Sequence, residues 1–118
     1  MTPTQEFVER LAAMDVRIAE LLAKHIRDND ETLPHVFMGD VVQFAGEIAG
    51  HEGRDSNLLD AILWVIERAL RSGVPEVEEL VVVSFLENLE QTEDAYAEIA
   101  RRLGPESRRA LEIVERER

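Results

Sequence analysis

The sequence predicts an all-α fold, a compact bundle of about five to six helices with short loops, in which residues 1–118 form a single all-helical domain. Apolar residues recur at spacings of three and four along most of the chain, and this spacing lines one face of an α-helix. Proline and short polar residues stand where these runs begin, as they do at helix starts. The sequence lacks the sustained alternation of polar and apolar residues that would indicate half-buried strands.

The first predicted helix covers residues 2–27. Thr2 suits the N-cap position, Pro3 suits the first helical position, and Gln5 can complete a capping box with Thr2. The apolar residues that follow share one helix face: Phe7, Leu11, Met14, Ile18, Leu21 and Leu22. A polar connector, residues 28–32, separates this helix from the next one.

The second and third predicted helices lie on either side of residues 50–57, a loop rich in turn residues. Pro34 can open the second helix, whose buried face would contain Phe37, Val41, Phe44 and Ile48. Asp55 or Ser56 would cap the third helix, and Gly73 would end it. The buried face of the third helix would contain Leu59, Ile62, Leu63, Ile66 and Leu70.

A fourth helix is predicted from Pro75 to about Leu89. The β-branched residues 81–83 would suit a strand, but the residues on both sides keep a helical spacing. The buried face would contain Val77, Leu80, Val81, Ser84, Phe85 and Asn88. We therefore expect a central helix that is buried on most sides.

The last part of the chain predicts two shorter helices. Thr92 would cap the fifth helix and place Glu93 and Asp94 in its first turn, where the helix dipole favours acidic groups. Its inward face would contain Tyr96, Ile99 and Leu103. Gly104 and Pro105 would end it before a final helix that buries Leu111 and Val114.

The composition excludes several classes of function. The chain has 25 acidic and 13 basic residues and a formal net charge of −12, which argues against binding to nucleic acid or to an anionic membrane surface. It has no cysteine, so disulfides and thiolate chemistry are excluded. The first residues do not resemble a secretory signal, and we therefore expect a cytoplasmic protein.

The acidic residues are unevenly distributed, because residues 28–53 and 72–100 contain neither lysine nor arginine. A solvated surface alone would explain this bias, and an acidic face that meets a basic protein is the alternative. Under the second interpretation, the predicted partner-binding residues are Asp28, Asp30, Glu31, His35, Asp40, Glu52, Asp55, Glu87, Asn88, Glu90, Glu93 and Asp94.

The sequence shows no constellation of residues that is typical of catalysis. His35 and Asp40 are five residues apart, which places them about 140° apart around a helix. Glu47 and His51 have the four-residue spacing of a metal pair, but they lack a third ligand. No nucleophile elbow or phosphate-binding loop is present. We expect no enzyme activity, no cofactor and no metal, although an enzyme that uses His35, Asp40 and a distant glutamate remains an alternative.

Two segments carry a resemblance to a known family: LPHVFMGDV at residues 33–41 and LVVVSFLENL at residues 80–89, with the leucine-rich residues 58–70 between them. Together they resemble a poorly characterised family of short, acidic, all-helical bacterial proteins, a domain of unknown function that includes candidate toxin-immunity proteins. The matching positions are Pro34, His35, Asp40, Glu87 and Asn88. The resemblance implies a protein partner and transfers no catalytic residue.

The leading hypothesis is a non-enzymatic protein-binding domain, an immunity protein that neutralises a cognate bacterial toxin through an acidic surface. The partner would be a basic toxin domain, because complementary charge speeds the association of two proteins. The alternative is a small-molecule-binding or regulatory helical domain, with a pocket lined by Phe37, Met38, Phe44 and Phe85. The sequence leaves the formation of homo-oligomers open.

Overall fold

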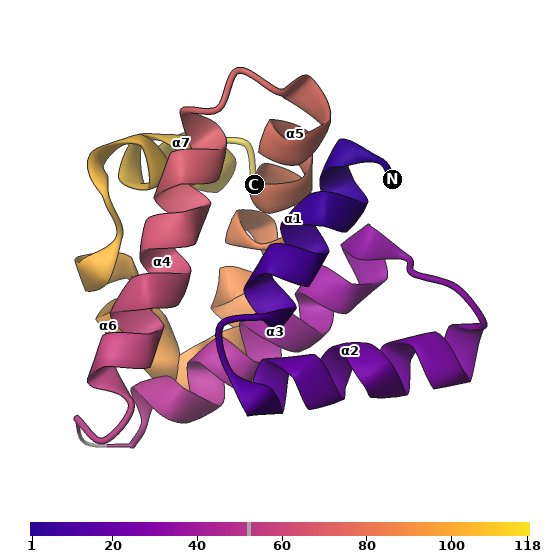
Figure 1. The fold of residues 1–118 in the computed structure, drawn as a ribbon. Coiled ribbons are helices and arrows are strands. Elements are labelled where there is room, and N and C mark those ends of the chain that lie inside the picture. The colour runs from indigo at the N-terminus through magenta and orange to yellow at the C-terminus, as the bar shows by residue number, and fades with distance from the viewer. Residues whose placement is uncertain (52) are drawn as a thin grey trace.

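The computed structural model describes residues 1–51 and 53–118, and none of these residues lies in a strand (Figure 1). The elements in chain order are α1 (Pro3–Ala12), α2 (Val16–Asn29), α3 (Pro34–Ala49), α4 (Ser56–Leu70), α5 (Pro75–Ser84), the 3₁₀ helix η1 (Leu86–Ala95), α6 (Tyr96–Arg102) and α7 (Pro105–Arg116). The all-α fold predicted from the sequence is confirmed.

The central element is α3, which packs against α1, α2, α4, α5, η1 and α6. Figure 1 shows α2 along one edge of the molecule and α6 and α7 on the opposite side. The two acids of α3, Asp40 and Glu47, are both exposed, whereas its buried side chains are all apolar. The helix can therefore be surrounded by other helices without burying a charge.

The predicted helix faces form one hydrophobic core. Phe37, Leu80, Val81 and Phe85 are completely buried. So are inward residues of the first and third predicted helices, at 0–1% exposure: Leu11, Ile18, Leu59, Ile62 and Ile66. Residues 81–83 all lie within α5, and Val83 is on its exposed side. The predicted helix is therefore confirmed, and the strand is excluded. The helices are held together by the close packing of these side chains and by the removal of their apolar surface from water.

The single helix predicted over residues 2–27 is wrong, because the chain ends α1 at Ala12 and starts α2 at Val16. Asp15 is extended, and its Oδ1 accepts a hydrogen bond of 2.8 Å from the Arg17 amide, as an N-cap residue does. Met14 and Ile18 preserve the helical spacing across the break, so periodicity alone does not reveal it. The predicted capping box of Thr2 and Gln5 is confirmed.

The predicted helix boundaries around Thr92 are also wrong. The α-helix ends at Ser84, and the chain continues in η1, which contains Glu93 at φ 52° and ψ −109°. Thr92 does not cap a helix, because its hydroxyl donates to the Leu89 carbonyl at 2.6 Å. A Cβ at Gly46 would lie 3.0 Å from Thr92 Cγ2, so η1 packs directly on the backbone of α3. This tertiary contact outweighs the local preference for an α-helix start.

Candidate functional site

The first group of predicted partner-binding residues lies at the end of α2. Asp28, Asp30 and Glu31 are exposed, and Asp30 adopts a left-handed conformation that ends the helix. Lys24 donates to Asp28 at 2.6 Å, and this hydrogen bond lowers the pKa of Asp28. Asp30 and Glu31 form no ion pair with the residues that the structure describes.

A second predicted residue, Asp40, lines a groove of about 470 Å³ between α2, α3 and η1. We call it the acidic groove, and its lining is Leu21, Gly39, Asp40, Gln43, Phe44, Glu47 and Gln91. Asp40 and Glu47 are seven residues apart and therefore lie on one side of α3. Both are exposed, and neither forms an ion pair within the described ranges 1–51 and 53–118. No lysine or arginine lines the groove.

The third group lies on η1, which borders the acidic groove through Gln91, whereas Glu87 of the same helix lines another groove together with Arg118. Glu87, Glu90, Glu93 and Asp94 are exposed, and Gln91 of the same helix lines the groove. Glu90 is paired with Arg118 at 2.7 Å. Asn88 differs from these acids, because its side-chain amide donates to the Ser84 carbonyl at 3.0 Å and so satisfies the end of α5.

His35 contacts Ser84 instead of Asp40, the acid that an acid–base site would need. Its Nδ1 lies 2.5 Å from the hydroxyl of Ser84, a buried residue of α5. Asp40 lines the acidic groove instead. The structure therefore brings His35 and Ser84 together and joins α3 to α5 through them.

Asp55 belongs to a charged network that joins the starts of α2 and α4. Arg17 donates to Asp55 at 3.0 and 3.2 Å and also to Asp15 at 3.0 Å, and His51 Nδ1 lies 2.8 Å from Asp55. The hydrogen bonds from Arg17 and then from His51 lower the pKa of Asp55 to about 2. The Arg17 guanidinium also lies 5.3 Å from the centre of the Phe44 ring. Asp55 thus already has strong partners within the chain.

Glu52, another predicted partner-binding residue, lies outside the described residues. The related pairing of Glu47 with His51 is replaced by the contact between His51 and Asp55. Among residues 1–51 and 53–118, no three histidine, aspartate or glutamate side chains gather closely enough to hold a metal ion. None of the helices there combines the length and the apolar character needed to cross a bilayer.

Sequence analysis missed Glu67, a carboxylate on α4 that is only 1% exposed. It accepts hydrogen bonds of 2.9 Å from the amide and hydroxyl of Ser107, 3.1 Å from the Glu106 amide and 2.9 Å from Arg71. Burial raises the pKa of Glu67, but these donors lower it more, so the carboxyl stays ionised. Glu67 therefore caps the N-terminus of α7 from another helix.

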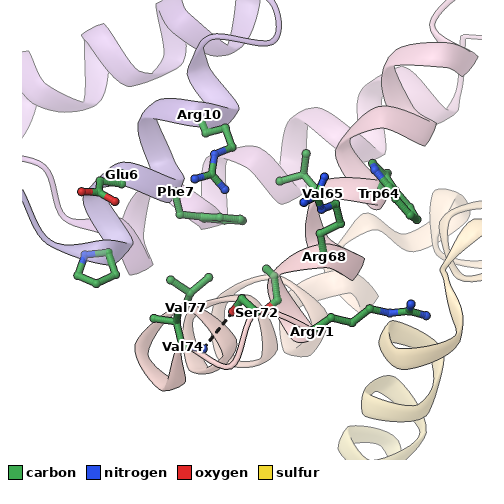
Figure 2. A pocket seen from close by; sticks show the side chains of 12 residues that line it. Glu6, Phe7, Arg10, Trp64, Val65, Arg68, Arg71, Ser72, Val74 and Val77 are labelled. Carbon is green, nitrogen blue, oxygen red and sulfur yellow. Dashed lines mark hydrogen bonds between the residues drawn. The ribbon is translucent and has the colours of Figure 1, made fainter.

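Another groove lies between α1, α4 and the start of α5, and its volume is about 690 Å³ (Figure 2). We call it the arginine groove, and it is lined by Pro3, Glu6, Phe7, Arg10, Trp64, Val65, Arg68, Ala69, Arg71, Ser72, Val74 and Val77. Of the residues expected to line a pocket between the second and fourth predicted helices, Phe37, Met38 and Phe85 are completely buried, and Phe44 lines the acidic groove. Sequence periodicity could not locate a groove that three separate helices build together.

The chain belongs to the family described as "Domain of unknown function (DUF7674)", whose sequence profile matches residues 6–116. This agrees with the resemblance of residues 33–41 and 80–89 to a poorly characterised family, and it assigns no activity. No curated protein matches the chain, and no solved structure matches it.

Proposed function

We propose that this member of the family is a cytoplasmic, non-enzymatic protein-binding domain that receives a basic partner at the acidic groove and the adjoining acids of η1. The observation that supports this proposal is that Asp40 and Glu47 form no ion pair with any described residue, because the nearby Arg17 is already paired with Asp15 and Asp55. Carboxylates that have no partner within the fold keep their full attraction for positive charge on another protein.

The lining of the acidic groove suits an arginine or lysine side chain of the partner. Leu21 offers apolar surface for the aliphatic stem, and Asp40 and Glu47 offer carboxylates for the charged end. Glu93 and Asp94, which follow Gln91 on η1, are exposed and add negative charge beside the groove. The surface therefore combines long-range attraction with a place for one buried anchor.

The finer proposal is that the chain is an immunity protein for a bacterial toxin with a basic active site. The net charge of −12 and the resemblance of residues 33–41 and 80–89 support this role. Inhibition would need no chemistry from the chain, because an acidic protein seated over a basic cleft excludes the substrate. The alternative of a small-molecule-binding domain concerns the arginine groove, which is a different part of the surface.

The direct test begins with a search of the neighbouring genes for a basic toxin domain. The chain is then co-expressed with that domain, and cell survival and the binding between the two purified proteins are measured. We expect the double variant D40N/E47Q to weaken binding about tenfold or more, mainly through slower association. The variant E9Q/E112Q removes two exposed acids of α1 and α7 and should bind normally. A chain that neither binds that protein nor protects the cells would contradict the immunity role.

A further inference from the structure

We propose that the arginine groove binds a small organic anion, in which one carboxylate or phosphate group is attached to a flat apolar body. This inference is independent of the proposed function, because the arginine groove and the acidic groove share no lining residue. The occupant follows from the charge, the apolar walls and the size of the groove.

The charge of the groove is opposite to that of the molecule. Three arginines line it beside a single acid, Glu6, although the whole chain carries a net charge of −12. Arg71 is held by Glu67 at 2.9 Å, and Figure 2 shows its side chain extending away from the groove. Arg10 and Arg68 form no ion pair within the described residues, and they come from helices on two sides of the groove.

These two guanidinium groups are suited to a single anionic group. Each presents several N–H donors in a plane, which matches the oxygens of a carboxylate or phosphate. A charge-assisted hydrogen bond is about twice as strong as one between neutral groups.

The remaining lining is apolar and includes one aromatic ring that the fold leaves accessible. Trp64 is 59% exposed, although an indole of this size is normally well buried in a protein. Phe7, Val65, Val74 and Val77 complete the apolar walls. A flat ring can stack against Trp64, and a volume of about 690 Å³ is within the usual range for small-molecule sites.

The walls of the groove are fixed before any ligand arrives. Ser72 donates to the Ala69 carbonyl at 2.7 Å and accepts from the Val74 amide at 3.2 Å, which holds the turn between α4 and α5 (Figure 2). Glu67 anchors the same end of α4 to α7. A preformed site loses little conformational freedom on binding, which favours affinity.

The test uses 8-anilinonaphthalene-1-sulfonate and its neutral analogue N-phenyl-1-naphthylamine, which has the same aromatic body without the sulfonate. Trp64 is the single tryptophan of the chain, so energy transfer from it reports a probe bound to the folded chain, and the arginine variant R10Q/R68Q places that probe in the groove. We expect one bound sulfonate probe per chain and about tenfold weaker binding of the neutral analogue, the effect of losing a charge-assisted contact.

The variant R10Q/R68Q should weaken the sulfonate probe about tenfold and leave the neutral analogue unchanged. The matched control is R27Q/R54Q, which removes two exposed arginines outside the groove lining and should bind both probes normally. Circular dichroism of each variant checks that it is folded. Equal affinity for the two probes, or an unchanged affinity in R10Q/R68Q, would overturn the proposal.

Competition then identifies the anionic group. Displacement of the probe by 2-naphthoate, by 2-naphthyl phosphate and by the neutral 2-naphthol separates a carboxylate, a phosphate and no charge on one aromatic body. We expect at least one of the two anions to compete about tenfold better than 2-naphthol. If the wild-type chain binds no probe but sediments as a dimer that R10Q/R68Q dissociates, the groove takes a second copy of the chain and the proposal is wrong.

Discussion

Glu67 and Asp40 are carboxylates of the same acidic chain, yet their surroundings are opposite. Glu67 is 1% exposed and accepts four hydrogen bonds, from Ser107 twice, Glu106 and Arg71. Asp40 is exposed beside the acidic groove, and the described residues offer it no cation. The hydrogen-bonding partners of a carboxylate, more than the number of acids in the chain, therefore decide whether it stabilises the fold or remains available for binding. A satisfied one holds the fold, and an unsatisfied one is available to another molecule.

Among the substitutions that test this contrast, Glu67→Gln is expected to change the free energy of unfolding most. The substitution keeps the shape of the side chain. The new NH₂ group, however, would face N–H and O–H groups that now donate hydrogen bonds to the Glu67 carboxylate. We expect the free energy of unfolding to fall by about 3 kcal/mol, and the melting temperature by about 10 °C. Urea unfolding measures the change. Glu98→Gln, at half-exposed ion pairs with Arg102 and Arg101, should cost much less than Glu67→Gln.

Gly104→Ala tests the same carboxylate from the opposite side. A Cβ at Gly104 would lie 2.6 Å from the Glu67 carboxyl carbon, so Glu67 would have to move away from the amides of α7. We expect a loss of about 2 kcal/mol in the free energy of unfolding. Gly39→Ala is the matched control, because nothing lies within 4 Å of its added Cβ inside α3. It should stabilise the helix by about 0.5 kcal/mol, and equal effects of the two substitutions would contradict the role of Glu67.

Asp55 is intermediate between the buried Glu67 and the exposed Asp40. Lowering the pH should reveal its contribution to the stability of the fold. Its pKa falls from the usual 3.8 to about 2, chiefly through the hydrogen bonds from Arg17 and His51. A depressed folded-state pKa stabilises the protein above the unfolded pKa, and this contribution is lost as the pH falls from about 4 to about 2. We therefore expect Asp55→Asn to be less stable than the wild-type chain at neutral pH. The difference should shrink through that range in thermal unfolding, and a gap that stays constant would contradict the network.

The sequence predicted the parts of the fold that depend on local spacing. The inward faces of the helices, the capping box at Thr2 and the helical state of residues 81–83 follow from the order of neighbouring residues. The break at Asp15 was missed because Met14 and Ile18 continue the apolar spacing across it. Thr92 was misjudged because its contact is with Gly46, far away in the sequence.

The candidate sites were less predictable for the same reason. The spacing did place Glu67 four residues after Leu63, on a buried face, which was a signal that an acid there needs donors. Its donors, Ser107 and Glu106, are about forty residues away and could not be paired with it from spacing. The arginine groove likewise joins Arg10 to Arg68, and only the packing of α1 on the other helices brings them to one hollow.

The smallest effect on stability is expected from D40N/E47Q, which removes two acids where Glu67→Gln removes one. Neither the Asp40 nor the Glu47 side chain forms a hydrogen bond or ion pair among the described residues, so the free energy of unfolding should stay within about 0.5 kcal/mol of wild type. Any change should be a slight gain at low salt, because the net charge of −12 repels itself and salt screens that repulsion. Urea unfolding at low and high salt measures both points. A loss of unfolding free energy as large as that of Glu67→Gln would mean that these carboxylates also stabilise the fold. That result would contradict the proposal that the acidic groove is a binding surface.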